Sequence, residues 1–314
     1  MIVSGFQHQV GGHFGLFVCG GHVCKPFNDR EYDFYRQIDD RFAPYTTQCC
    51  GCISIIVQKY TKNALVLNAD KEITCHTHSL SRDKITFYIA ENDHVDSDFC
   101  DNNWAKQCQC NAVQMMIKHG HEKFLLLVNI VDEYICPSII DLKMGTRQYG
   151  DDASDEKRAM QTIKCRESTS AETGIRLVGM QLYNPELNNY LYMNKYEGRA
   201  MDRGGLSDAL ASFFKSAGRI RCMILLNKLT ALTKVVENAE GFRFFSSSLL
   251  VAFDGKTKTT NIDLSDSIDI RMIDFAHSTF NGFLNDKRYS GPDKGYLLGL
   301  NSLTRIVTDI LMKF

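Results

Sequence analysis

A strand-like stretch, PSIIDLKMG, places a carboxylate and an amine two residues apart within an apolar run. Successive side chains of a β-strand point to opposite faces, so Asp141 and Lys143 share one face and their apolar neighbours share the other. A charge buried without a partner is strongly unfavourable, so each group needs one. That partner could be another protein group in a structural ion-pair network, or an ion or substrate in a polar cleft. The motif alone leaves both interpretations open.

More cations follow this strand at spacings that allow them to converge. Arg147 continues the alternation, and the next segment predicts a helix over about Ser154–Ser168. On that helix Lys157 and Lys164 fall on one stripe that carries no acidic residue. A solvated helix face usually mixes acids into such a stripe. Convergent cations of this kind suit a multiply phosphorylated small molecule.

Two further residues suit a nucleotide site. Asp274, in MIDFAHS, ends an apolar strand and precedes a phenylalanine, as the metal-binding aspartate of kinase-like sites does. Lys25, in the predicted strand HVCKPF, could reach nucleotide phosphates. Each signal is weak alone, because aspartates end many strands and a lysine on a strand is commonly a solvated edge residue.

Twelve cysteines and nine histidines raise the alternative of a zinc site. The groupings CCGC, CHTH, CQC and HGH do not supply the two well-spaced C-x-x-C pairs typical of structural zinc. We therefore interpret them as ordinary buried or surface residues. No secretory signal is evident, so the thiols are expected to be reduced.

Composition narrows the class of protein. The 314 residues are 44% hydrophobic and 23% charged, typical of a globular protein long enough for two domains. Thirty-six basic and 37 acidic residues give a net charge of -1, which does not favour a nucleic-acid partner. No apolar run approaches the roughly 20 residues of a membrane span. The expected location is the cytosol, the nucleus or both.

The elements that must position these residues fall into two parts. The first is β-rich, with a hairpin about Gly20-Gly21, a helix through DREYDFYRQI capped by Asn28, and the strands CISIIVQKY, NALVLNA, KITFYIA and FLLLVNIV. Residues 92–123 have a mixed pattern and are interpreted as an insertion or as an approach to the next lobe. The sequence thus predicts domains over 1–130 and 131–314.

The second part alternates strands and helices. Predicted strands are GIRLVGMQLY and NYLYMNKY, joined through Asn184-Pro185, and then FRFFSSSLLVAF and DIRMIDFA. Predicted helices cover about Arg219–Asn238 and the C-terminal segment GYLLGLNSLTRIVTDILMKF. The fold class is therefore α+β.

Together these motifs resemble the inositol polyphosphate kinases. PSIIDLKMG fits the pattern P-x-x-x-D-x-K-x-G, and its continuation through GMQLY is similar to the inositol hexakisphosphate kinase branch. Further matches are CKPFNDREYDFY, NKYEGR, FRFFSSSLLVAFDG, DIRMIDFAHSTF and GPDKGYLLGL. The resemblance covers residues 8–38 and most of 124–312. It implies a reduced protein-kinase-like fold with two lobes, antiparallel sheets and ATP between the lobes.

The resemblance also implies residue roles at the nucleotide. Lys25 would contact the ATP phosphates, and backbone groups near Val128 and Ile130 would read adenine. The family often has an acidic residue where Val128 stands, so the adenine amino group is expected to rely on a backbone carbonyl. Asp141 would hold the ribose or orient the attacking oxygen, and Lys143 would lie between the γ-phosphate and the acceptor.

Metal and substrate contacts are implied in the same way. Asp274 would bind Mg²⁺, with the hydroxyl of Ser247 or Ser248 nearby. The cations implied for the inositol phosphate are Lys143, Arg147, Lys157, Lys164 and Lys195.

The implied activity is Mg²⁺-dependent transfer of the γ-phosphoryl group of ATP to a highly phosphorylated inositol, giving a diphosphoinositol phosphate. An acceptor phosphate is already ionised, so the reaction needs no general base. One alternative is phosphorylation of hydroxyls on less phosphorylated inositols. Another is a catalytically inactive relative that binds inositol phosphates as a sensor or scaffold.

Overall fold

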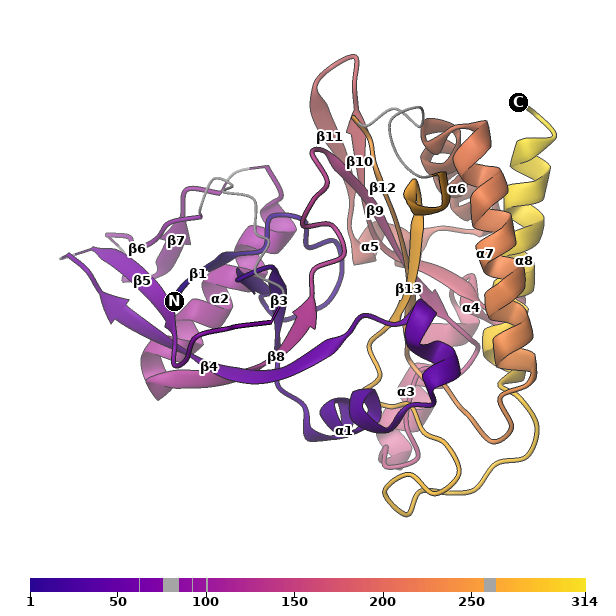
Figure 1. The fold of residues 1–314 in the computed structure, drawn as a ribbon, viewed down its shortest axis with the longest axis horizontal. Coiled ribbons are helices and arrows are strands. Elements are labelled where there is room, and N and C mark those ends of the chain that lie inside the picture. The colour runs from indigo at the N-terminus through magenta and orange to yellow at the C-terminus, as the bar shows by residue number, and fades with distance from the viewer. Residues whose placement is uncertain (62, 76–84, 92, 100, 257–263) are drawn as a thin grey trace. The chain divides into compact units, whose positions relative to one another are not determined.

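A computed structural model of the chain describes residues 1–61, 63–75, 85–91, 93–99, 101–256 and 264–314 (Figure 1). The chain divides into two compact units. The first unit comprises Met1–Tyr32 and Thr47–Glu133, and the second comprises Asp33–Thr46 and Tyr134–Phe314. Residues 33–46 were placed in the first domain from the sequence, but they belong to the second unit because Phe34 and Phe42 lie in its core.

The first unit is built on one antiparallel sheet. Among the described residues its strand order is β1-β2-β3-β8-β4-β5-β6-β7, and β1 also pairs with β5, so the sheet curls back on itself. Its strands are β1 (Ile2–Gly5), β2 (Phe17–Cys19), β3 (His22–Pro26), β4 (Cys49–Lys59), β5 (Ala64–Ala69), β6 (Phe87–Ile89), β7 (Val95–Ser97) and β8 (His121–Val128).

The hairpin between β2 and β3 turns at the predicted glycines. Gly20 and Gly21 have φ values of 53° and 74°, and Cys19 pairs directly with His22. Two consecutive positive φ values define the type I′ turn, which suits glycine. Helix α1 (Asp29–Gln37) follows β3, and the Asn28 side chain accepts a hydrogen bond from the Glu31 backbone as a cap.

Residues 92–123 form an integral part of the first unit. Their described portion contains β7 and helix α2 (Asn103–His119), which packs on β4, β7 and β8. Ala105, Val113 and Met116 of α2 lie in the apolar core of this unit. The description of this segment as an insertion or as an approach to the next lobe did not foresee this helix, and the mixed pattern reflects a helix with a narrow buried face.

The second unit contains a separate antiparallel sheet. Among the described residues its order is β11-β10-β9-β12-β13, with β9 in the centre. Its strands are β9 (Pro137–Met144), β10 (Ile175–Asn184), β11 (Asn189–Met193), β12 (Ser248–Asp254) and β13 (Asp269–Ile273). Helices of this unit are α3 (Asp155–Arg166), α4 (Ser170–Thr173), α5 (Lys195–Ala200), α6 (Arg203–Ala217), α7 (Arg219–Glu237) and α8 (Lys294–Leu311), and its short 3-10 helices are η1 (Asp40–Tyr45) and η3 (Leu264–Asp266).

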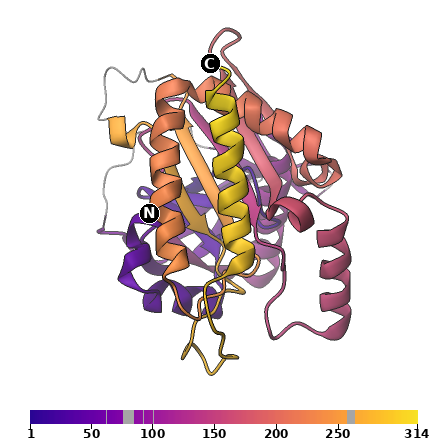
Figure 2. The same cartoon turned by 90° about the vertical axis from the view of Figure 1, so that its right-hand side faces the viewer.

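Helices cover one face of this second sheet. Figure 2 shows α7 and α8 side by side along the sheet, and both contact its strands. Ile140, Leu142 and Met144 of β9 point into this helix-covered core and are fully buried. The opposite face of β9 is therefore left for its charged residues.

One predicted strand ends earlier than expected. The strand through NYLYMNKY stops at Met193, and α5 begins at Lys195. Asn194 and Glu197 form a capping box, in which each side chain accepts a hydrogen bond from the other end of the first turn. This local signal outweighs the aromatic, strand-like composition. Within the described part of the chain, no helix combines the length and apolar character that a membrane span requires.

Candidate active site

The central strand β9 presents an acid and an amine on the face opposite the core. Asp141 is 3% exposed, and the side chain of Lys143 is 16% exposed. This confirms the alternation predicted from the sequence. Because Asp141 is almost completely buried, its charge must be balanced within the protein or by a bound ion.

Strand register brings a distant aspartate to this pair. Lys143 of β9 lies opposite Ser248 of β12, which lies opposite Ile273 of β13. Asp274 follows Ile273 directly, and its Oδ2 is 4.0 Å from Nζ of Lys143. Residues far apart in the sequence therefore meet across three neighbouring strands.

The backbone of Asp274 adopts an unusual conformation. Its φ is 67°, in the left-handed region that non-glycine residues seldom occupy. Such a conformation costs on the order of 1–3 kcal/mol and persists where the surrounding structure enforces it, often at functional sites. Here it turns the carboxylate at the end of β13 toward the central strand.

Asp141 has a perturbed acidity. Burial, followed by the negative charge of Asp274, raises the pKa of Asp141 from 3.8 to about 6. The Lys143 ammonium, the nearby Ser248 hydroxyl and the Arg176 guanidinium oppose this rise. Oδ1 of Asp141 is buried and has no hydrogen-bond partner among the described residues. An orphaned carboxylate oxygen beside a second carboxylate is a suitable ligand set for a hard divalent cation such as Mg²⁺.

The two serines proposed beside the metal differ in what they contact. Ser248 lies in register with Lys143 and close to Asp141. Ser247 is fully buried, and its hydroxyl donates to the carbonyl of Phe244 at 2.7 Å. Of the two hydroxyls, that of Ser248 is the better placed to assist at the carboxylates.

Arg176 is a cation of this face that did not appear among the sequence-based site residues. It lies on β10 directly opposite Lys143, and a β-bulge between Leu177 and Gly179 follows it. Burial, followed by the positive charge of Arg199, lowers the pKa of Arg176. Lys143 and Arg176 thus place positive charge beside the buried aspartate, and Arg199 adds a further guanidinium near Arg176. Both arginines lie in motifs that carried the family resemblance, so the signal was available.

Close packing of α5 on β10 positions Arg199. A Cβ added at Gly198 would lie 2.2 Å from the carbonyl oxygen of Leu177, so only glycine fits there. Lys195, on the same helix, is 8% exposed, and its Nζ lies 4.9 Å from the ring centroid of Tyr196. The segment NKYEGR thus places two cationic side chains, Lys195 and Arg199, on one short helix.

Arg147 has protein partners. Its guanidinium donates to Asp151 Oδ1 at 2.6 Å and to the Tyr289 hydroxyl at 3.3 Å. The same group lies 3.9 Å from the ring centroid of Phe245. A paired and stacked arginine of this kind holds the loop after β9, and its part in substrate binding remains a prediction.

Helix α3 turns its polar stripe toward the protein. Lys157 and Lys164 are half-buried, whereas Met160 and Ile163 on another face are 48% and 51% exposed. The Ser154 side chain caps the helix by accepting from the Lys157 backbone. Neither ammonium forms an ion pair with a described residue, which leaves both lysines suited to an anionic ligand.

In the first unit, Lys25 pairs with a glutamate. Its Nζ lies 2.7 Å from Oε1 of Glu31, whose side chain is 1% exposed. A strand lysine held by a helix glutamate is the arrangement that positions ATP phosphates in protein kinases. Glu31 was not among the sequence-based site residues, although it lies six positions after Lys25 in the quoted motif.

The predicted adenine contacts near the end of β8 differ from one another. The Val128 backbone donates to Gln48 and accepts from the Thr47 hydroxyl, so both of its groups are already engaged. The Ile130 backbone has no hydrogen bond with a described residue. Ile130 is thus the better candidate for reading a base.

Comparisons with known proteins agree on the fold and the family. The structure superposes on the inositol phosphate multikinase from S. cerevisiae, solved with ADP and Mn²⁺, with a TM-score of 0.60 over 94% of this chain and 99% of that one, at 22% identity. The two therefore share the kinase-like α+β fold. The family described as inositol polyphosphate kinase matches residues 124–308.

Curated relatives extend this match over nearly the whole chain. The chain is 32% identical to inositol hexakisphosphate kinase 3 of Mus musculus, covering 97% of this chain and 94% of the relative. It is 32% identical to inositol hexakisphosphate kinase 2 of Homo sapiens, covering 99% and 95%. The chain belongs to the inositol polyphosphate kinase family.

Proposed function

We propose that this chain transfers the γ-phosphoryl group of ATP to inositol hexakisphosphate and forms a diphosphoinositol phosphate. The names of its curated relatives support this substrate. The observation that carries the proposal is the cluster of Asp141, Lys143 and Asp274, in which an ammonium lies 4.0 Å from one carboxylate and beside a second, buried one.

Asp274 and Asp141 would hold Mg²⁺, with Ser248 nearby, because they combine carboxylates with an orphaned buried oxygen. When bound, Mg²⁺ neutralises phosphate charge and orients the phosphates for in-line transfer. Ser247 is left out of this set because its hydroxyl proton is donated to the Phe244 carbonyl.

Lys143 would stabilise the transferred group. Phosphoryl transfer depends on positioning and on neutralising charge that spreads over the equatorial and leaving oxygens. An ammonium held by β9 on the face of Asp141, and only 16% exposed, loses little freedom in meeting that charge. The acceptor is an ionised phosphate, so Asp141 need not act as a base. With a pKa of about 6 it is mostly ionised at neutral pH.

The surrounding cations would bind the inositol phosphate. Arg176 lies opposite Lys143, and Arg199 and Lys195 come from the helix that packs on β10. Lys157 and Lys164 add two half-buried ammonium groups that form no ion pair with an acidic side chain in the described part of the chain. Guanidinium groups match phosphate geometry in bidentate contacts, and lysines contribute point charges.

For the nucleotide, Lys25 would contact the ATP phosphates while Glu31 orients it. Backbone groups of Ile130 would read the adenine. These residues belong to the first unit, whereas the residues proposed for metal and phosphoryl transfer belong to the second.

The direct test is a transfer assay. The full chain is incubated with ATP labelled at the γ-phosphate, Mg²⁺ and either inositol hexakisphosphate or an inositol trisphosphate, and the products are separated. We expect a labelled diphosphate product from the hexakisphosphate that disappears with Lys143→Met. Label only on the trisphosphate would favour the hydroxyl-phosphorylating alternative. Tight binding of both inositols with no transfer would favour an inactive scaffold.

A further inference from the structure

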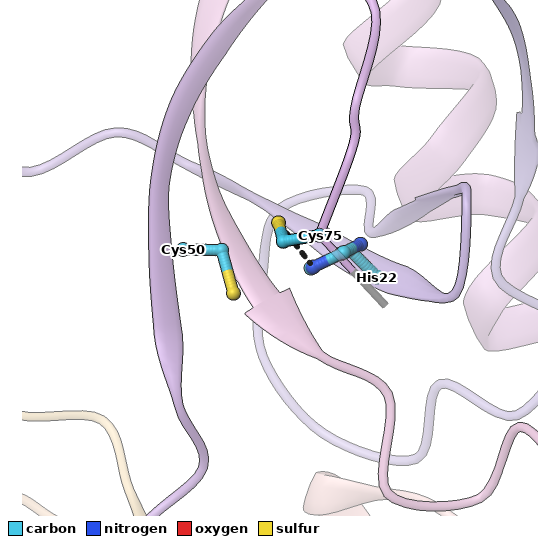
Figure 3. A group of neighbouring side chains, drawn as sticks. All are labelled: His22, Cys50 and Cys75. Carbon is cyan, nitrogen blue, oxygen red and sulfur yellow. Dashed lines mark hydrogen bonds between the residues drawn. The ribbon is translucent and has the colours of Figure 1, made fainter. Parts of the chain in front are cut away.

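Three side chains that can ligate a metal gather in the first unit, and none of them is among the residues proposed for phosphoryl transfer. His22, Cys50 and Cys75 have ligand atoms that all lie within 4.8 Å of one another, around a shared space (Figure 3). They come from β3, from β4 and from the segment after β5. Because these are three separate segments, no local C-x-x-C spacing in the sequence could indicate the cluster.

The separation between two of these atoms fits a tetrahedral zinc site. Sγ of Cys75 lies 3.6 Å from Nε2 of His22. With Zn–S near 2.3 Å and Zn–N near 2.0–2.1 Å, tetrahedral coordination separates sulfur and nitrogen by about 3.6 Å. These two ligand atoms therefore already have the spacing that a shared zinc ion requires.

The imidazole is also oriented as a metal ligand. Nδ1 of His22 lies 2.7 Å from the carbonyl oxygen of Gly20, and the ring is fully buried. A carbonyl can only accept, so Nδ1 must carry the proton and Nε2 keeps its lone pair toward Cys75. Zinc-binding histidines usually have their second nitrogen fixed by such a backbone contact.

We propose that His22, Cys50 and Cys75 bind a zinc ion that joins β3, β4 and the segment after β5. Two thiolates and an imidazole form a soft donor set that suits zinc better than Mg²⁺. The three ligands leave one tetrahedral position for a water molecule or another ligand. Since these ligands are brought together only by the fold, metal binding would stabilise the first unit.

The first experiment measures bound metal. The full chain is purified in reductant without chelator, supplied with Zn²⁺, freed of excess metal and analysed for zinc. We expect about one zinc per chain, and at least a fivefold lower content in Cys50→Ser and in Cys75→Ser. Cys136→Ser, which changes a half-buried cysteine of the second unit, is the matched control and should keep the full content.

A second experiment does not depend on how well the variants fold. Wild-type protein, with and without Zn²⁺, is treated briefly with an alkylating reagent, and the modified cysteines are mapped by mass spectrometry. We expect zinc to slow the modification of Cys50 and Cys75 at least tenfold while leaving Cys136 unchanged. Replacing Zn²⁺ with Co²⁺ should give a thiolate-to-cobalt absorption band that both serine variants lose.

Three results would overturn the proposal. One is less than a tenth of a zinc per chain after reconstitution with the thiols reduced. Another is stoichiometric zinc that neither serine variant removes. The third is a Cys50–Cys75 disulfide in protein that was purified with reductant, which would show that the two sulfurs pair with each other instead of with a metal.

Discussion

Lys143 on the central strand and Asp274 after the edge strand β13 are held with Nζ and Oδ2 4.0 Å apart. This distance is longer than a hydrogen bond, so the two charges attract each other without closing into a tight pair. The intervening strand β12 fixes their separation through its register with both neighbours. The strands of the second unit thus fix the separation of these two charges themselves.

Replacing Lys143 should remove most of the phosphoryl-transfer activity. Lys143→Met removes the ammonium and keeps the length of the side chain, so we expect kcat to fall by about 10²–10³-fold, the loss typical of a missing stabilising donor. Lys228→Met is the matched control, because Lys228 is similarly shielded in the second unit and donates to the Ile268 carbonyl. A fall of less than tenfold for Lys143→Met would contradict the role assigned to this residue.

Asp141 should make stability depend on pH. Its pKa is about 6 in the fold against 3.8 ordinarily, so the folded state binds the proton more tightly than the unfolded state. The stabilisation of the folded state by the proton on Asp141 is complete below about pH 4 and is lost as the pH rises through about 6. As the pH rises from 4.5 to 8, the unfolding free energy of the wild type should therefore fall by on the order of 2 kcal/mol relative to that of Asp141→Asn.

This change can be measured by urea unfolding in EDTA without nucleotide, so that no ligand masks the carboxylate. Asp208→Asn, at an exposed position of α6, controls for the loss of an acid elsewhere. A difference between Asp141→Asn and wild type that stays constant over this pH range would show that the buried carboxyl does not titrate as described.

Glycine at position 198 should be required for the packing of α5. Ala in its place would bring Cβ to 2.2 Å from the Leu177 carbonyl, so α5 must move away from β10. We expect the unfolding free energy to fall by about 2–4 kcal/mol, as for overpacked sites, and transfer to weaken as Arg199 is displaced. Gly204 lies in the first turn of α6, and the atom nearest to an added Cβ is Oδ1 of the Asp202 side chain, at 3.4 Å. Gly204→Ala should therefore be neutral or stabilising by about 0.5–1 kcal/mol. Thermal and urea unfolding of both variants measures the contrast, and equal effects would contradict it.

Arg176 should contribute to binding the inositol phosphate. Arg176→Ala removes the guanidinium opposite Lys143, and we expect the KM for inositol hexakisphosphate to rise at least tenfold while the KM for ATP changes less than threefold. Steady-state kinetics with each substrate varied in turn separates the two. Arg305→Ala, at an exposed position of α8, should change neither constant. Parallel rises in both constants for Arg176→Ala would indicate a general structural defect.

Replacing Tyr289 should lower the stability of the fold without changing substrate binding. Its hydroxyl lies 2.7 Å from Asp151 Oδ1 and 3.3 Å from Arg147, so Tyr289→Phe should lower the unfolding free energy by about 1–2 kcal/mol. If Arg147 serves mainly to hold the loop after β9, the KM for inositol hexakisphosphate should stay within twofold of wild type. A tenfold rise without loss of stability would return Arg147 to the substrate site. Tyr60→Phe, exposed in the first unit, is the control.

The sequence predicted best where local periodicity and burial agree. The alternation of β9 followed directly from one buried apolar row, the Asn28 cap marked the start of α1 correctly, and the helix predicted over about Ser154–Ser168 matches α3 closely. The link from Lys143 to Asp274 came from the family resemblance, because strand register between distant segments leaves no local pattern.

The remaining errors have physical causes. Helix α2 was missed because a 17-residue segment with one narrow buried face reads as polar. The start of α5 was missed because the capping box at Asn194 outweighs neighbouring aromatic residues. The partners of Arg147, Val128 and Lys25 depend on how the chain packs, and no spacing rule gives access to them.

The polypeptide crosses between its units three times, after Tyr32, after Thr46 and after Glu133. Neither half is consequently a contiguous segment that could be excised. A fragment beginning at Tyr134 would lack Phe34 and Phe42, whose rings contact those of Phe242, Phe244, Phe275, Phe280 and Phe283. Without these two rings, the aromatic core of the fragment would be exposed to solvent. Residues 33–46 therefore complete the core that the C-terminal part of the chain forms.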